Sequence, residues 1–259
     1  AAGVLNVVST TVGQPGIRGA QSDATVTLVG ADVRLGAGIT TPGALISITG
    51  PVMVSGSVAL DTTNAGAVTA GANVTVNNTI DGTSALADDL LFNVGDGTLT
   101  LGGNLGGTTR LGDVTIQTAG IVNAQGIRAA SLTQSAANAT TGATTFAGAV
   151  DTTTLVDLTG RDFTFQNTVT AGSTIDVDGR DGTFSGAVSA GGNVTVTGSA
   201  FTFSAGLTTT SGGGFTADHT GDLTIQTGIF NLDGAFTDNG VGNTLLGGNI
   251  TTTGDAVSL

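Results

Sequence analysis

The chain of 259 residues contains no cysteine, tryptophan, tyrosine, lysine or glutamate, so every acidic residue is aspartate and every basic residue is arginine. The absence of cysteine excludes disulfide bonds and thiolate metal sites, and it leaves packing and hydrogen bonds to hold the fold. With 19 acidic residues against six arginines, the formal net charge is −13. This balance disfavours nucleic acids and anionic membranes as partners, because both require a basic surface.

Long apolar runs are also missing, and none approaches the roughly 18 residues that a membrane-spanning helix needs. Proline occurs only at positions 15, 42 and 51, so no proline-rich linker divides the chain. We therefore expect a single elongated domain over residues 1–259. The chain begins AAGVLNVVSTT, without methionine or a charged export region, and it ends in mid-pattern with TTTGDAVSL. We interpret it as an internal or processed piece of a longer repetitive protein.

What the chain does contain is 44 glycines and a hydrophobic share of 39%, with valine, leucine, isoleucine and phenylalanine spaced singly between small polar residues. Segments such as DFTFQ (162–166), STIDVD (173–178) and GNVTVT (192–197) alternate apolar and polar residues. This period of two is typical of half-buried strands. No segment has the helical period, so we predict an all-β protein.

The most informative feature is an internal repeat. Phe146, Phe165, Phe184 and Phe203 follow one another at intervals of 19 residues. Four further columns keep this interval: Val150, Val169, Val188 and Leu207; Val156, Ile175 and Val194; Leu158, Val177 and Val196; and Gly160, Gly179 and Gly198. A unit this short cannot bury its own apolar face, so it must stack on its neighbours. The repeat therefore predicts a parallel β-solenoid with one unit per coil.

This architecture makes specific predictions for the side chains. Equivalent residues should lie above one another at the strand spacing of about 4.8 Å. The four phenylalanines should form a buried stack, and Thr145, Thr164, Thr183 and Thr202 an outward ladder. The glycines at 160, 179 and 198 should mark a corner that needs positive φ or close backbone approach. At roughly 19–20 residues per coil we expect about 13 coils and a rod of about 60–65 Å.

The register is most regular at 145–207 and looser elsewhere. Leu35 and Val54, and likewise Ile39 and Val58, are again separated by the repeat interval. The step from Phe203 to Ile225 is longer than this interval, because TTTSGGGF (208–215) carries extra residues. The phase cannot be followed near 60–66, 81–90 and 133–144, and we expect ALADDL (85–90) to be a loop that bulges from a coil.

Whole phrases also recur. TFAGAV (145–150) returns as TFSGAV (183–188), VTAGANVTV (68–76) as VSAGGNVTV (188–196), and GDVTIQT (112–118) as GDLTIQT (221–227). We interpret each copy as one coil of a stacked rod.

Phrases such as AGGNVTVTG (190–198) and GDLTIQTG (221–228), together with the interval of the repeat, resemble the repeat regions of filamentous-haemagglutinin-type exoproteins. They are similar, more loosely, to autotransporter passenger domains. The resemblance implies a right-handed β-helix in a large bacterial surface or secreted protein, often an adhesin. The chain lacks the NPNG-type motif of the secretion domain and a basic heparin-binding stretch, so it would be shaft rather than export module or adhesive tip.

DVDGRDG (176–182) is the stretch most like a binding site. Calcium prefers several hard oxygen ligands, and Asp176, Asp178 and Asp181 could supply them. The spacing misses the EF-hand pattern by one residue, and Asp176 and Asp178 should face outward. We favour a solvated acidic face and keep a weak Ca²⁺ site as the alternative; we expect no other cofactor.

Paired carboxylates at Asp88 and Asp89 are reminiscent of pectin-degrading β-helix enzymes, which use such pairs as acid and base. Those enzymes also need a histidine and a basic residue, whereas here His219 is the only histidine and lysine is absent. We interpret Asp88 and Asp89 as a surface-loop pair and His219 as a turn residue. We predict no catalytic residues.

The leading hypothesis is the structural shaft of a secreted or cell-surface bacterial adhesin or extracellular filament, without catalysis. The alternative is a β-helix that binds or cleaves carbohydrate, and host or cell-surface glycans are potential partners. An ice-binding solenoid is more remote, because the Thr195/Thr197 pair gives way to Asp176/Asp178 one coil earlier. The ends show no capping coil, so we expect flanking coils of the same polypeptide or head-to-tail self-association.

Overall fold

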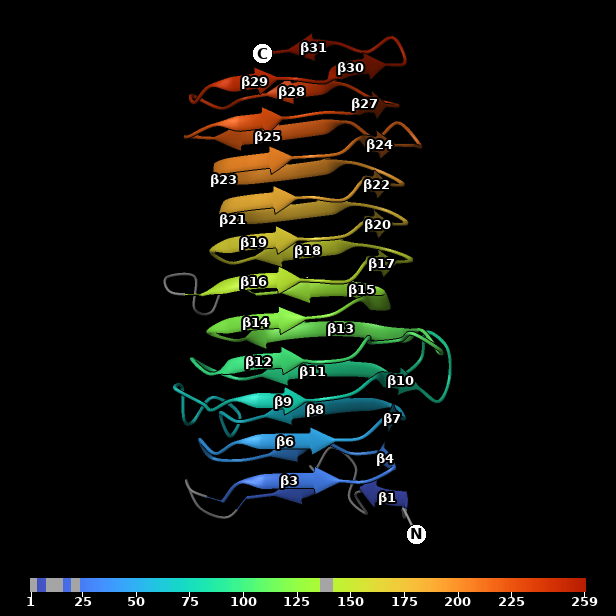
Figure 1. The fold of residues 1–259 in the computed structure, drawn as a ribbon, viewed down its shortest axis with the longest axis vertical. Helices are drawn as coiled ribbons and strands as arrows, with labels where there is room; N and C mark the ends of the chain where they lie inside the picture. The colour runs from blue at the N-terminus through green and yellow to red at the C-terminus, as the bar shows by residue number, and fades with distance from the viewer. Residues whose placement is uncertain (1–3, 8–15, 20–23, 136–141) are drawn as a thin grey trace.

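The computed structural model describes residues 4–7, 16–19, 24–135 and 142–259. Within these ranges the chain forms 31 short strands and no helix, and every ladder between named strands is parallel. The strands wind into one upright stack, with the N-terminus at one end and the C-terminus at the other (Figure 1). The protein is therefore a parallel β-solenoid, as the repeat predicts.

Each coil contributes strands to three faces, which we name A, B and C in the order in which the chain visits them. Face A consists of β3 (Val26–Val29), β6 (Ile46–Thr49), β9 (Val74–Val76), β12 (Thr98–Leu101), β14 (Ile121–Ala124), β16 (Ala143–Phe146), β19 (Asp162–Phe165), the second halves of β21 (Ile175–Phe184) and β23 (Val194–Phe203), β26 (Leu223–Ile225) and β29 (Thr244–Leu246).

Face B consists of β1 (Val4–Val7), β4 (Asp32–Leu35), β7 (Val52–Val54), β10 (Ile80–Gly82), the first half of β15 (Ile127–Gln134), β17 (Val150–Thr152), β20 (Val169–Ala171), β22 (Val188–Ala190), β24 (Leu207–Thr209), β27 (Ile229–Leu232) and β30 (Asn249–Thr252). Between β10 and β15 the face is continued by Leu105 alone, which bridges Ile80 and Ile127.

Face C consists of β2 (Ile17–Arg18), β5 (Ile39–Thr40), β8 (Ser57–Asp61), β11 (Asp89–Asn93), β13 (Leu111–Thr118), the second half of β15, β18 (Val156–Thr159), the first halves of β21 and β23, β25 (Phe215–His219), β28 (Phe236–Asp238) and β31 (Val257–Ser258). β21 and β23 pass from face C to face A without a break, and β15 passes in the same way from face B to face C.

The solenoid has about 11 turns. The expectation of about 13 coils is wrong, because several coils outside 145–207 are longer than the repeat unit. Ile46 pairs with Val74, and Val74 pairs with Leu99, and both steps exceed the interval that separates the phenylalanines. At about 4.8 Å per turn the stack rises about 50 Å rather than 60–65 Å. The right-handed winding that the family resemblance implies stays a prediction.

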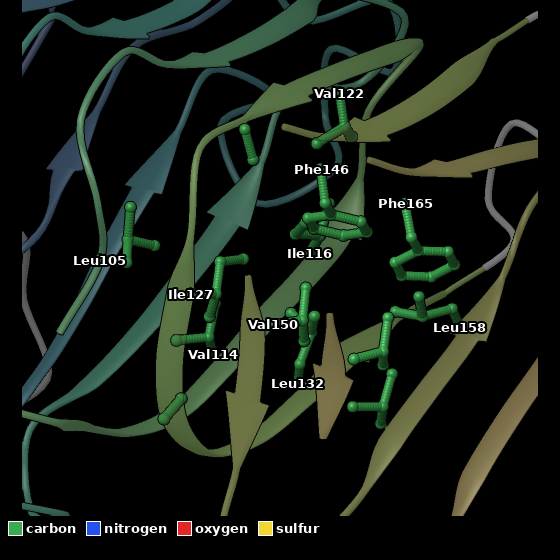
Figure 2. Close-up of a cluster of buried hydrophobic side chains, with 14 of the residues drawn as sticks. Leu105, Val114, Ile116, Val122, Ile127, Leu132, Phe146, Val150, Leu158 and Phe165 are labelled. Carbon is green, nitrogen blue, oxygen red and sulfur yellow. The ribbon is translucent and has the colours of Figure 1, made fainter. Parts of the chain in front are cut away.

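The phenylalanine stack is confirmed. Phe146, Phe165, Phe184 and Phe203 pair in register on face A, and at most 1% of each residue is exposed. Successive ring centroids are 5.3, 4.7 and 4.6 Å apart, with interplanar angles of 17°, 11° and 1°. Figure 2 shows the first two of these rings inside the rod beside apolar residues from the other faces, such as Val150 and Leu158. The rings are therefore stacked and nearly parallel.

Outside residues 145–207, the repeat interval predicts some of the observed strand pairings but not all of them. Leu35 pairs with Val54, and Phe203 pairs with Ile225 as the longer step requires. Ile39, however, pairs with Leu60 and not with Val58. The reason is that the chain takes a longer path from Val54 to Leu60 than from Leu35 to Ile39.

Segments where the phase could not be followed coincide with extra loops. Residues 62–73 connect β8 to β9, and residues 83–88 connect β10 to β11. Part of ALADDL (85–90) lies in the second loop, as expected, while its last two residues begin β11. The third uncertain segment, 133–144, includes residues 136–141, which lie outside the described residues. Figure 1 shows loops leaving the stack near β9 and β10.

The recurring phrases belong to different coils, but they do not all occupy the same face of the rod. GDVTIQT (112–118) lies in β13 on face C, whereas GDLTIQT (221–227) contains β26 on face A. In each copy the corresponding two apolar residues point inward. The phrase therefore encodes a half-buried strand but not its face.

Close backbone approach explains the glycines at the C–A corner. A Cβ at Gly198 would lie 1.6 Å from the carbonyl oxygen of Gly179 in the coil below. A Cβ at Gly160 or Gly179 would lie 2.8 or 2.7 Å from ring atoms of Phe163, which fills this corner. Glycine is thus required where coils touch or where a ring takes the space that a side chain would need.

Candidate functional site

The acidic stretch at the C–A corner does not converge on one point. Asp176 and Asp178 are exposed and alternate with buried neighbours along β21. Asp181 lies beyond the corner, and its carboxylate is 2.8 Å from Nε of Arg180. Arg180 also contacts Asp162, so the third carboxylate belongs to an ion-paired surface cluster. Nowhere in the described ranges do three histidine, aspartate or glutamate side chains gather as metal ligands would.

Like charges lie across from one another on this strand. Asp157 of β18 is paired in register with Asp176. Partial burial, the Asp157 carboxylate and the neighbouring Asp178 together raise the pKa of Asp176 above its ordinary value. The ionised form of Asp176 is therefore less stable in the folded protein than in the unfolded chain.

We expect Asp176→Asn to stabilise the protein by about 0.2–0.5 kcal/mol, allowing for solvent screening of this exposed group. The sign follows from the raised pKa, because the folded state holds the proton more tightly and loses stability as the pH rises through that pKa. The gain should appear in urea denaturation at pH 7 and vanish below about pH 3.9. Asp218→Asn is the control, since Asp218 pairs with Thr197 rather than with a carboxylate; an equal gain there would contradict the argument.

The interpretation of Asp88 and Asp89 as a surface-loop pair is wrong for Asp88, which is only 4% exposed. Its carboxylate accepts hydrogen bonds from the backbone N–H of Gly56 (2.6 Å) and Ser84 (2.7 Å) and from the hydroxyl of Thr83 (3.0 Å). Burial alone would raise the pKa of Asp88, but these hydrogen bonds outweigh it and hold the pKa below its ordinary value. The carboxylate fastens loop 83–88 to the coil below.

Asp89 begins β11 and joins a polar row along face C. It accepts hydrogen bonds from the Ser57 hydroxyl (2.9 Å) and from the N–H of Asp113 (2.9 Å), and Asp113 in turn accepts one from Ser131 (2.6 Å). Asp88 and Asp89 thus bind separate parts of the scaffold. This arrangement differs from two carboxylates that converge on one substrate atom.

Two arginines join neighbouring coils near Leu105, where face B lacks a strand. Arg110 donates hydrogen bonds to the carbonyl oxygens of Ala129 (3.2 Å) and Asp151 (2.6 Å), and it forms an ion pair with the Asp151 carboxylate. Arg128 also approaches this carboxylate, at 3.5 Å. Together they join three successive coils beside Leu105. The surface here is a shallow hollow, lined by Asn104, Leu105, Gly107, Gly126, Arg128, Gly148, Ala149, Asp151, Thr168 and Thr170.

His219 is the last residue of β25 and is buried, so the expectation of a turn residue is wrong. Its Nε2 lies 2.9 Å from Oδ1 of Asp238, and its Nδ1 lies 2.7 Å from the carbonyl oxygen of Gly221. Its register partner is Gly198, so His219 continues the corner column of glycines at 160, 179 and 198. The repeat interval alone would have placed Ala217 at this corner, because it does not count the extra residues of 208–215.

The hydroxyl ladder of face A is confirmed and is longer than predicted. Thr145, Thr164, Thr183 and Thr202 pair in register and point away from the buried phenylalanines. Paired residues extend the ladder in both directions; the full series is Thr27, Ser47, Thr75, Thr100, Asn123, Thr145, Thr164, Thr183, Thr202 and Thr224. The Thr195/Thr197 pair on face C does stack on Asp176/Asp178, as the sequence indicated.

Compared with protein-family models, curated proteins and solved structures, the chain matches none. In the described part of the chain, no helix is present that could cross a membrane. The class of protein that the structure defines is therefore a parallel β-solenoid repeat protein.

Proposed function

We propose that this chain is a structural shaft segment of a secreted or cell-surface bacterial protein, an adhesin or an extracellular filament. The observation that carries the proposal is a core column that runs through the rod without interruption. Its members are paired in register and buried on face A: Leu28, Ile48, Val76, Leu101, Ala124, Phe146, Phe165, Phe184, Phe203 and Ile225. Such a column gives a stiff rod whose length is set by the number of coils.

Two further features support an extracellular shaft. The absence of cysteine, lysine and glutamate and the net charge of −13 give a surface of hydroxyls and aspartates, which favours solubility. The phrases AGGNVTVTG and GDLTIQTG resemble the repeat regions of filamentous-haemagglutinin-type exoproteins. The location outside the cell and the bacterial origin are part of the proposal.

A carbohydrate-binding role is the second candidate, and the shallow hollow with Arg128 and Asp151 favours it. Against it stands the distribution of aromatic residues. The chain has no tyrosine or tryptophan, and all ten phenylalanines are buried. No aromatic ring is thus available to stack on a sugar.

The proposal includes a partner at the C-terminal end of the rod. Leu246 and Val257, which lie above buried Ile225 and Phe236, are 45% and 49% exposed. An apolar column that ends in solvent is completed by a further coil. Either a flanking coil of the same polypeptide or the first coil of another copy supplies it.

Changing the number of coils tests the shaft function. Residues 166–184 form one complete coil, so three tandem copies in place of one add about 10 Å to the rod and preserve every core column. In the producing cell, the protein should remain detectable on intact cells, and adhesion or filament assembly should persist with the longer rod. Binding to a glycan array that is lost in Arg128→Ala, but not in the lengthened rod, would instead establish the second candidate.

A further inference from the structure

The His219 ring is sealed inside the C–A corner near the end of the rod. Its side chain has no exposed surface. Gly240 and Gly242, in the next coil, close over it. A Cβ at Gly240 would lie 2.4 Å from ring atoms Cδ2 and Nε2, and one at Gly242 would lie 3.0 Å from Nδ1. Glycine at position 240 thus leaves room for the ring, while at position 242 it is required first by the carbonyl oxygen of Gly221, 1.5 Å from an added Cβ.

Both ring nitrogens face oxygen atoms that accept hydrogen bonds. The carbonyl oxygen of Gly221 can only accept, so Nδ1 must carry a proton. Oδ1 of Asp238 faces Nε2 and also accepts a hydrogen bond from the N–H of Gly240 (2.9 Å), while Oδ2 accepts one from the Thr244 hydroxyl. The N–H of Gly240 and the Thr244 hydroxyl favour the ionised carboxylate, and an ionised carboxylate only accepts, so we expect a proton on Nε2 as well.

We propose that His219 is an imidazolium cation, paired with the Asp238 carboxylate, and that this buried ion pair fastens the last two coils to the rod. Its members come from successive coils: His219 from β25, Asp238 from β28 and Thr244 from β29. Neutralising either charge leaves the other buried without a counter-charge, which is strongly destabilising. The coils of β26–β31 then open while the phenylalanine stack stays closed.

The surrounding elements offer no substitute charge. Asp218 precedes His219 on β25 but is exposed, and Asp222 follows it at the corner and is exposed. Neither β23, which lies below the ring, nor β29, which lies beyond Asp238, carries a charged residue. Asp238 is therefore the acid that controls the pair.

Acid should open the pair. Burial alone would raise the pKa of Asp238, but the hydrogen bonds from Thr244 and Gly240 and the charge of His219 outweigh it and lower the pKa. A lowered carboxyl pKa contributes stability that is present above the unfolded value of about 3.9 and lost as the pH falls through the folded value. As the pH falls, the amides of β26–β31 should therefore lose their protection from hydrogen exchange before those of the coils that hold the phenylalanine stack.

Nitrogen NMR of the intact protein at pH 7 tests the charge directly, because His219 is the only histidine. We expect a proton on both ring nitrogens and slow exchange of both with solvent. A ring with one protonated nitrogen would overturn the proposal, including the tautomer in which Asp238 holds the proton.

Hydrogen exchange tests the fastening role. Asp238→Asn should accelerate amide exchange in β26 and β27 at pH 7 by at least about tenfold, with β19 and β20 unchanged. Asp222→Asn is the matched control, because it removes the same charge from an exposed side chain whose carboxylate accepts a hydrogen bond from Asn243. Equal effects of the two variants would refute the ion pair. If Asp238→Asn does not fold, His219→Gln provides the same comparison without altering the carboxylate.

Discussion

Replacing Phe184 by aspartate should unfold the middle of the rod. Phe184 lies between Phe165 and Phe203, with centroid distances of 4.7 and 4.6 Å, and is 1% exposed. A carboxylate at this position has no cation within the core, so it would be buried unpaired, at a cost of several kcal/mol. Since the neighbouring coils depend on this ring for their own packing, the loss should spread to β19 and β23. Thermal unfolding followed by circular dichroism should show it.

The milder variant Phe184→Ala gives the size of the packing term. We expect a loss of about 3–5 kcal/mol in the free energy of unfolding, the usual range for truncation of a core phenylalanine. Thr183→Ala is the control on the same strand, because its side chain points outward and should change stability by no more than about 0.5 kcal/mol. A thermal transition of Phe184→Asp that matches the parent protein would show that the stack does not support the fold.

Gly198→Ala should also be strongly destabilising. The added methyl group would lie 1.6 Å from the carbonyl oxygen of Gly179, so two backbone segments of adjacent coils must move apart. We expect a loss of about 3 kcal/mol, at the upper end of the range for overpacking, in chemical denaturation.

The matched control is Gly107→Ala, in the loop between Leu105 and β13. A Cβ at Gly107 would meet only the Cβ of Asn104, at 3.5 Å, which is ordinary contact. This substitution should therefore leave stability within about 0.5 kcal/mol. If both alanine variants lose stability equally, glycine acts at Gly198 through chain flexibility and not through close approach between coils.

The strands and their inward residues could be predicted from sequence because alternation is a local property. The repeat interval then placed Phe146 to Phe203 in one column without further information. The face on which a strand lies could not be predicted in this way, as GDVTIQT in β13 and GDLTIQT in β26 show. Which face a strand occupies depends on the lengths of all preceding corners, and loops such as 62–73 change that count without changing any strand.

The polar contacts were harder to predict for a related reason. The hydrogen-bond partner of Asp88 at Gly56 is 32 residues away, and that of His219 at Asp238 is 19 residues away. The first separation cannot be recognised before the coil lengths are known. The second equals the repeat interval, but the coils after residue 207 are longer, so that Asp238 pairs in register with Ala217 and not with His219. A loop aspartate and a histidine between polar residues resemble surface groups in sequence, yet both are enclosed by neighbouring coils.

The loops that leave the stack also determine which parts of the rod an antibody could recognise as unique positions. On face A a polar ladder runs from Thr27 to Thr224, with a hydroxyl in every coil except that of Asn123, so an antibody against that surface would meet a similar epitope about every 4.8 Å. The loops at 62–73 and 83–88 each occur once and carry residues with positive φ, among them Asn64, Ala65 and Leu86. Antibodies that recognise a single position on the rod should therefore be directed at these loops, while the faces present a repeated antigen.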